Sequence, residues 1–342
     1  MKLGLMAGYW TSGPPHGALE AILEGDRLGF DSVWTAEAYG SDALSPLAWW
    51  GSQTSQIGLG TAIMQMSART PAATAMAAMT MDHLSGGRFR LGLGVSGPQV
   101  VEGWYGQPFP KPLERTREYV SIMRDIFARE APVTHTGAQY QIPYQGGTGL
   151  GKPLKSTVHP FREDLPIYLG AEGPKNVALA AEICDGWLPI FFAPKDNGFY
   201  KNALEEGFAR SGARQTMATF DTAASIPFIP NPDLEQAADM VRPMLALYIG
   251  GMGAKGRNFH FDVFIRMGYE EACAKIQELY LSGDKMGAAA AVPLEMVDEM
   301  ALIGEPARIK DQVARLDESV IKTILISGPP ALMQVAADII LG

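Results

Sequence analysis

Short apolar runs alternate with longer stretches of helical periodicity along most of the chain. The runs are apolar at successive positions, which is typical of parallel strands that helices cover on both faces. Strands are predicted over 2–7, 30–35, 57–63, 89–95, 165–169, 186–191, 223–229 and 321–326. Helices are predicted over 17–28, 45–56, 71–84, 113–129, 174–184, 197–211, 234–247 and 306–316.

This alternation indicates an α/β fold with right-handed crossovers. The count of strand–helix units favours a closed (β/α)8 TIM barrel over an open, doubly wound sheet. Two segments are longer than the connections of a minimal barrel. The segment near 132–164 is rich in Gly, Pro and Gln and predicts a loop with room for a hairpin, and the one near 231–304 is long enough for several helices. We therefore expect residues 1–342 to form one barrel domain with two insertions, which usually shape the active-site mouth or a subunit interface.

Composition and charge narrow the classes of function. The chain carries 28 Lys and Arg against 37 Asp and Glu, a formal net charge of −9. Such a protein repels phosphate backbones and anionic lipids, which argues against nucleic-acid binding and membrane association. Residues 1–6 predict a strand rather than a signal peptide, and no apolar run reaches the ~20 residues of a membrane helix, so we expect a cytoplasmic protein. Cys184 and Cys273 are expected to be free core thiols.

Residues 92–97 match G-x-G-x-x-G directly after a strand, as in dinucleotide-binding folds. The motif follows the fourth strand rather than the first, and no strand that ends in an acidic residue follows at the expected distance. We therefore reject a Rossmann fold. At the carboxyl end of a barrel strand, glycines without a Cβ let the backbone approach a flat ring.

A second glycine segment runs from Gly170 to Asn176, between the fifth strand and a helix that begins near Pro174. The first backbone N–H groups of a helix form an anion site. Gly173 permits close approach, and Lys175 adds positive charge. Two interpretations stay open, a phosphate pocket for the tail of a cofactor and an ordinary strand-to-helix turn.

Several spaced motifs together resemble the bacterial luciferase-like superfamily, over roughly residues 2–190 and again at 304–306. They are Gly60-Thr61 followed by Arg69-Thr70-Pro71, Ser85-Gly86-Gly87-Arg88-Phe89, Leu91-Gly92-Leu93-Gly94, Pro166-Ile167-Tyr168-Leu169-Gly170, Gly173-Pro174-Lys175-Asn176 and Asp185-Gly186-Trp187. The branch that they resemble most uses the 5-deazaflavin coenzyme F420 rather than FMN. The resemblance implies a barrel with a flat redox ring at its carboxyl mouth and hydride transfer at the deazaflavin C5.

The resemblance also implies the residues of the cofactor site. In this family a bulge with a cis non-proline peptide after the third strand supports the ring, and Ala62 and Ile63 match it. Glu37 matches an acidic residue that meets the cofactor. Val95, Ser96 and Gly97 match family residues that contact the polar edge of the ring. The family's phosphate pocket is matched by Gly170, Ala171, Gly173, Pro174 and Lys175.

One position departs from the relatives. Several deazaflavin enzymes of the family carry a catalytic histidine directly after that acidic residue, and this chain has Ala38. Another group must then handle the proton, or the reaction differs. Transfer of a hydride to a polarised double bond needs a nearby proton donor, and the candidates are Glu37, Glu102 and Tyr105. A purely structural role for Glu37 stays an alternative.

Residues that follow strand ends are candidates for the wall of a substrate pocket. They are Tyr9, Trp10, His16, Tyr39 and Trp104. The remaining histidines lack metal-ligand spacing, so no metal site is expected.

The sequence thus predicts a coenzyme F420-dependent oxidoreductase that acts on a small organic substrate. It is expected to form a homodimer, and the methionines between 64 and 81 fill either the core or the subunit interface. One alternative is an FMN-dependent monooxygenase with a separate reductase. Another is a non-catalytic cofactor carrier, which Ala38 keeps open. A barrel lyase or aldolase would need a lysine or a metal at a strand end, and none is convincingly placed.

Overall fold

The computed structural model describes residues 1–252 and 258–342. Within these ranges eight parallel strands close into a barrel in the order β3-β2-β1-β13-β10-β9-β8-β5, and β3 pairs with β5 to complete the ring. Their bounds are β1 Lys2–Gly8, β2 Ser32–Thr35, β3 Gly58–Thr61, β5 Phe89–Gly94, β8 Ile167–Gly170, β9 Gly186–Leu188, β10 Asp221–Ser225 and β13 Thr323–Ile326. Each overlaps a predicted apolar run, and the predicted (β/α)8 fold is confirmed.

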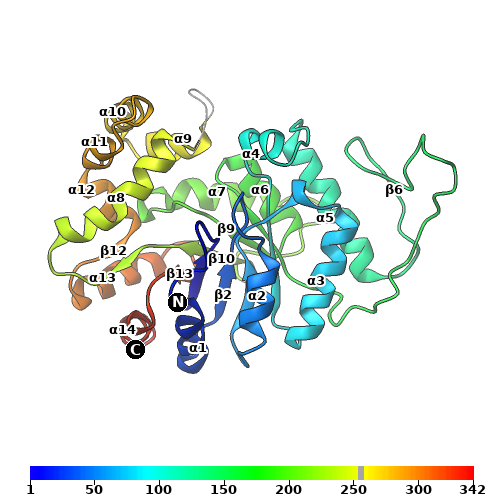
Figure 1. The fold of residues 1–342 in the computed structure, drawn as a ribbon, viewed down its shortest axis with the longest axis horizontal. Coiled ribbons are helices and arrows are strands. Elements are labelled where there is room, and N and C mark those ends of the chain that lie inside the picture. The colour runs from blue at the N-terminus through cyan, green and yellow to red at the C-terminus, as the bar shows by residue number, and fades with distance from the viewer. Residues whose placement is uncertain (253–257) are drawn as a thin grey trace.

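Helices cover the outside of the barrel (Figure 1). They are α1 Ala18–Leu28, α2 Leu44–Gly51, α3 Pro71–Ser85, α5 Pro112–Ala128, α6 Pro174–Ile183, α7 Asn197–Phe208, α13 Pro306–Asp317 and α14 Pro330–Ile340. Proline begins several of them because the first helical position needs no N–H donor. Two helices were not predicted, α14 and the short α4, Pro98–Gly103, which directly follows the glycine motif. None of the helices within the described ranges is both long and apolar enough to span a bilayer.

The two insertions lie on opposite sides of the barrel (Figure 1). The first contains the hairpin of β6 (His135–Thr136) and β7 (Gln141–Ile142). The second contains α8 Leu234–Gly250, α9 Phe259–Arg266, α10 Glu270–Leu281, α11 Lys285–Ala290 and α12 Leu294–Met300. These helices pack around a hydrophobic cluster of their own, separate from the main core of the barrel. The second insertion therefore has internal packing that can hold it as a unit beside the mouth.

Two of the predicted apolar runs are interrupted, and in each the chain resumes as a separate short strand. The run 223–229 is split, because Pro227 lacks the N–H that a central strand needs. Beyond it, β11 (Phe228–Ile229) pairs with β12 (Leu302–Ile303) outside the barrel. The run 57–63 also breaks at Thr61, and the chain resumes as β4 (Met64–Gln65), which pairs with β5. Apolarity alone does not show where a buried chain leaves the sheet.

Large aromatic side chains fill the centre of the barrel. Trp34 and Tyr168 meet edge to face with ring centroids 5.1 Å apart. Gly60 and Gly186 leave them room, because a Cβ at either position would lie within 2.3 Å of one of these rings. This buried cluster packs against Ala62 and Ile63 and so forms the floor of the mouth.

Candidate active site at the barrel mouth

The carboxyl ends of β3, β5 and β8 meet around the Ala62–Ile63 peptide, which is cis. The N–H of Glu37 donates to the carbonyl of Ile63 at 3.0 Å. The Ile63 side chain lies over two glycines, since a Cβ would come within 2.5 Å of it at Gly94 and within 2.9 Å at Gly170. The structure therefore has a cis bulge at the position that the resemblance implied.

Gly92 serves the barrel rather than a ligand. A Cβ there would lie 1.8 Å from the carbonyl oxygen of Thr61. The Thr61 hydroxyl donates to the Gly92 carbonyl at 2.8 Å and accepts from the Gly92 N–H at 2.9 Å. The expectation that this glycine makes room for a ring is corrected, because it lets β3 approach β5.

Glu37 follows β2, and its side chain is only 5% exposed. Arg69 donates to both carboxylate oxygens, from Nη1 at 2.7 Å and from Nη2 at 2.9 Å. The N–H of Gln65 adds a third bond at 2.9 Å. Because both oxygens already accept from the protein, the geometry supports a positioning role for Glu37. Arg69 belongs to one of the family motifs, but no role was predicted for it from the sequence.

Tyr105 lies just beyond α4 and is half-buried. Its hydroxyl donates to the carbonyl of Ala38 at 2.9 Å, at the position where relatives carry a histidine. Burial raises the pKa of Tyr105, and the nearby negative charge of Glu37 raises it further. Glu102, on α4, is exposed and forms no ion pair within the described ranges. The structure thus brings Tyr105 to the strand ends and leaves Glu102 at the surface.

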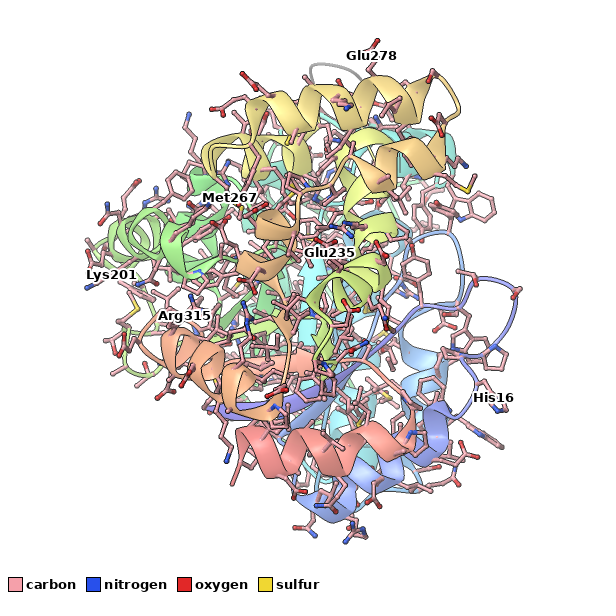
Figure 2. All side chains as sticks on the ribbon, turned by 90° about the vertical axis from the view of Figure 1, so that its left-hand side faces the viewer. His16, Lys201, Glu235, Met267, Glu278 and Arg315 are labelled. Atoms are coloured by element: carbon pink, nitrogen blue, oxygen red, sulfur yellow. The ribbon has the colours of Figure 1, made fainter. Side chains whose placement is uncertain are left out.

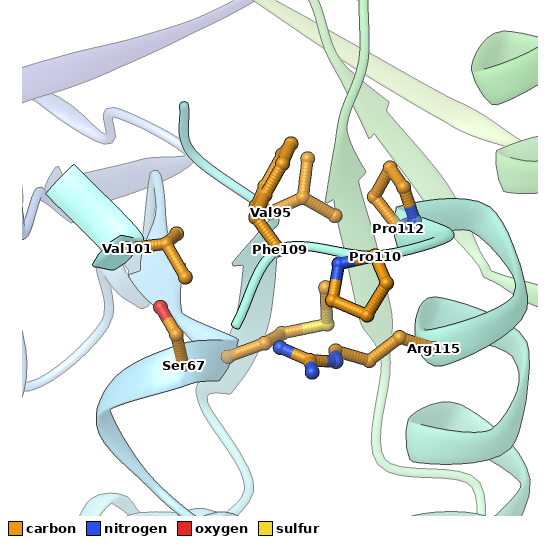
Figure 3. A pocket seen from close by; sticks show the side chains of 8 residues that line it. Ser67, Val95, Val101, Phe109, Pro110, Pro112 and Arg115 are labelled. Atoms are coloured by element: carbon orange, nitrogen blue, oxygen red, sulfur yellow. The ribbon is translucent and has the colours of Figure 1, made fainter. Parts of the chain in front are cut away.

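The turn that ends β5 spans residues 95–97, and Ser96 adopts a left-handed conformation with φ 56°. A small cavity beside this turn is lined by Met66, Ser67, Val95, Val101, Phe109, Pro110, Pro112 and Arg115. Figure 3 shows Arg115 reaching from α5 toward Ser67. The Ser67 hydroxyl and the Arg115 Nε are buried and have no hydrogen-bond partner in the part of the chain that the structure describes. Such atoms call for water or a polar ligand.

The predicted wall residues separate into two groups. Tyr9 and Trp10 are half-buried beyond β1, and the indole nitrogen of Trp10 is buried without a partner among the described residues. Tyr39 and Trp104 are largely exposed and lie at the rim. His16 is exposed and lies at the edge of the molecule (Figure 2). Tyr9 and Trp10 therefore lie just beyond a strand end, with the Trp10 ring 6.2 Å from that of Trp50 on α2, and His16 is left exposed.

The turn between β8 and α6 leaves the end of the helix open. Gly173 caps the helix with φ −77°, and a Cβ there would meet no atom within 4 Å. Its carbonyl accepts from the N–H groups of Asn176 and Val177, each at 3.0 Å. Pro174 has no N–H, and Lys175 is exposed without an ion pair in the described ranges. This open end fits a phosphate group, and the phosphate pocket stays a prediction.

A buried hydrogen-bonded pair at the mouth was not among the residues predicted from the sequence. Glu172 accepts a hydrogen bond from His260 of α9, with 2.8 Å between Oε1 and Nδ1. The His260 ring meets those of Tyr248 and Phe191 edge-on, at 4.9 and 5.9 Å. Burial raises the pKa of Tyr248 to about 12, and the nearby Tyr9 and Glu172 add to the rise. The sequence did contain one sign of this pair, because Glu172 is a charged residue among small ones just after a predicted strand.

The closed parallel barrel places the protein in the class of TIM barrels. A cis bulge, a paired carboxylate and a phenol lie at its strand ends, where TIM-barrel enzymes have their active sites. The model of the luciferase-like monooxygenase family matches residues 4–323, so the chain belongs to this family. A Mycobacterium tuberculosis protein provisionally named a coenzyme F420-dependent oxidoreductase is 56% identical over 316 residues, 92% of this chain and 91% of that protein. The 5,10-methylenetetrahydromethanopterin reductase of Archaeoglobus fulgidus is 30% identical, over 88% of this chain and 86% of its own.

Solved structures share the fold over almost the entire chain. The coenzyme F420-dependent tetrahydromethanopterin reductase of Methanopyrus kandleri superposes with a TM-score of 0.82 at 22% identity, covering 100% of this chain and 99% of its own. An F420-dependent secondary alcohol dehydrogenase, solved with an F420–acetone adduct, has a TM-score of 0.78 at 19% identity and covers 99% and 98%. Together with the family match and the named relatives, the fold establishes the chain as an oxidoreductase enzyme.

Proposed function

We propose that the chain is a coenzyme F420-dependent oxidoreductase that transfers a hydride between the deazaflavin C5 and a small organic substrate. The observation that carries the proposal is the cis Ala62–Ile63 bulge, which Glu37 holds and which lies over Gly94 and Gly170. The similarity to relatives named for this coenzyme supports the choice of F420 over FMN.

The residues at the mouth fit this cofactor. The Ala62–Ile63 bulge would support the ring, the turn at 95–97 would face its polar edge, and the open end of α6 with Lys175 would hold its phosphate. The unpartnered polar atoms of Trp10 and Ser67, both near strand ends, fit a site that a polar ligand completes. When bound, coenzyme F420 supplies the carbon that accepts or donates the hydride.

Tyr105 is the residue that we assign to proton transfer. A hydride that reaches a polarised double bond leaves negative charge on the neighbouring atom, which a nearby acid must neutralise. A phenol with a raised pKa stays protonated at neutral pH and can donate to that atom. The Arg69–Glu37 pair lies close by and positions the bulge through the Glu37 N–H.

A binding screen with coenzyme F420, FMN, FAD and NADPH tests the proposal. Titration should quench the fluorescence of coenzyme F420, and FMN should bind more weakly. Equal or tighter binding of FMN would replace the proposal with an FMN-dependent monooxygenase that works with a reductase. Binding of coenzyme F420 without turnover of any carbonyl, imine or activated alkene would favour a cofactor carrier.

The Gly173→Ala substitution separates phosphate binding from folding. The backbone conformation and the open space accept a methyl group, and the weaker capping by Ala opposes the gain from a less flexible unfolded chain. The free energy of unfolding should therefore change by no more than about 1 kcal/mol. If a phosphate approaches this backbone, the methyl group should weaken coenzyme F420 binding by about tenfold or more, a cost of about 1.4 kcal/mol. Fluorescence titration and urea unfolding measure the two effects. Unchanged affinity would remove the turn from the site.

We also propose a homodimer that forms through the exposed faces of α2 and α3, which both lie on the outside of the barrel (Figure 1). The exposed positions of α3 carry no Asp, Glu, Lys or Arg, and Met76 and Leu84 are 62% and 75% exposed. Trp49 on α2 is 71% exposed. An uncharged apolar face is complementary to its own copy across a two-fold axis. A second copy of this chain is therefore the occupant that we assign to it.

A charge on this face should break the dimer. Met76→Glu should shift the mass measured by light scattering from two copies to one, because it would bury carboxylates without partners. Met286→Glu is the matched control, since Met286 is exposed on α11, in the second insertion. A wild-type chain that is already monomeric at micromolar concentration would contradict the proposal.

A further inference from the structure

The reaction proposed above does not use the Glu172–His260 pair, although it is buried at the mouth. Glu172 is 9% exposed, and its Oε1 accepts from His260 at 2.8 Å. Its other oxygen, Oε2, is enclosed and accepts no hydrogen bond from any residue within the described ranges. A buried acceptor without a donor costs about 1–3 kcal/mol, and more when it is charged. This oxygen therefore marks a position where a ligand's hydrogen-bond donor would be bound favourably.

The place of Glu172 in the chain links the two ends of the proposed cofactor site. Gly170, at the start of the turn, lies against Ile63, where the ring is proposed to rest. Gly173, at the other end, begins α6, where the phosphate is proposed to bind. Glu172 lies between these two glycines. In coenzyme F420 a ribityl chain joins the ring to the phosphate, and its hydroxyl groups are hydrogen-bond donors.

We infer, building on the proposed function, that Glu172 accepts a hydrogen bond from a ribityl hydroxyl of the cofactor and that His260 positions the carboxylate. His260 comes from the second insertion, so the insertion takes part in cofactor binding. The rings of Phe191 and Tyr248 pack around His260 and keep the pair in a low-dielectric setting, where a hydrogen bond is stronger than in water.

Three deazaflavin ligands separate the ribityl contact from the other contacts. They are coenzyme F420, its precursor Fo with ring and ribityl chain but no phosphate, and 10-methyl-5-deazaflavin with the ring alone. Glu172→Ala should weaken the binding of coenzyme F420 and of Fo by the same factor, about 10- to 100-fold, as expected for the loss of a hydrogen bond to a charged group. The binding of the 10-methyl ligand should stay the same. Glu172→Gln, which keeps the shape and one acceptor oxygen, should give an intermediate affinity in an intact fold.

The alternative roles of Glu172 give different results. Unchanged affinity of Glu172→Ala for Fo would overturn the inference. A gain in affinity confined to the phosphate-bearing ligand would also overturn it, because Glu172 would then only repel the tail. If the wild type binds FMN but none of the three deazaflavins, the proposed function fails by itself. The ribityl contact is then judged by riboflavin against lumiflavin, which lacks the ribityl hydroxyls. Binding of no ribityl ligand would overturn both.

A double-mutant cycle tests the positioning role of His260. His260→Ala should weaken Fo binding in the wild-type background and have no further effect on Glu172→Ala, because it acts through that carboxylate. His260→Asn, whose side-chain amide can donate from near the position of Nδ1, should restore affinity. Equal losses in both backgrounds would show that His260 acts independently and would overturn its positioning role.

Discussion

Replacing Arg69 with methionine should lower the free energy of unfolding by about 3 kcal/mol, at the lower end of the range for breaking a buried ion pair. The substitution removes both side-chain donors to Glu37, whose carboxylate is 5% exposed, and leaves only the N–H of Gln65. Affinity for coenzyme F420 should fall as well, because the Glu37 backbone holds Ile63. Urea unfolding and fluorescence titration measure the two effects.

Two further variants make this result specific. Arg27→Met removes an arginine from an exposed pair with Glu24 and should leave stability nearly unchanged, since solvent screens such pairs. Combining Arg69→Met with Glu37→Gln should recover much of the lost stability, because no buried charge then lacks its partner. If Arg69→Met behaved like Arg27→Met, the Arg69–Glu37 pair would not hold the mouth.

Replacing Tyr105 with phenylalanine should reduce kcat by about 10²- to 10⁴-fold, the usual contribution of a positioned acid or base. The Kd for coenzyme F420 should not change, because only the hydroxyl is removed. The raised pKa of Tyr105 keeps the phenol protonated through neutral pH. The rate of substrate reduction should therefore be insensitive to this group near neutrality and fall as the pH rises through that raised pKa, in the alkaline range. Steady-state kinetics with the first carbonyl or alkene that the wild type reduces provide the measurement.

Glu102→Gln is the control for this prediction. Glu102 is exposed on α4, close to Tyr105 in the chain, and should be dispensable for the proton step. A loss of kcat in Glu102→Gln together with near-normal activity in Tyr105→Phe would reverse the assignment. Loss of coenzyme F420 binding in Tyr105→Phe would indicate a structural role for its hydrogen bond to Ala38.

The barrel could be predicted because parallel strands buried on both faces leave continuous apolar runs in the sequence. The limits of these runs were less certain where the chain leaves the sheet, as at Pro227. The cis bulge at Ala62 and Ile63 came from the family motifs and not from periodicity. A short run of glycines also has several uses, and Gly92 turned out to permit the close approach of β3 to β5.

The missed features of the site are contacts between distant positions. Arg69 and Glu37 are 32 residues apart, and His260 and Glu172 are 88 apart. A single sequence shows that each of these residues is polar or charged, but it does not show which residue each one contacts. The position of the Tyr105 hydroxyl at Ala38, 67 residues earlier, depends likewise on how the segment beyond α4 folds back. The contacts that determine the chemistry of the site are therefore made by loops and insertions, which the pattern of strands does not predict.

A crystal structure of the chain with coenzyme F420 tests the central claim most directly. The account predicts the ring against the Ala62–Ile63 bulge, the phosphate at the open end of α6 and the Tyr105 hydroxyl near the face that carries C5. Binding of the ring elsewhere, for instance in the groove between Phe192 and Arg315 beside α13, with the barrel mouth free of ligand, would contradict it.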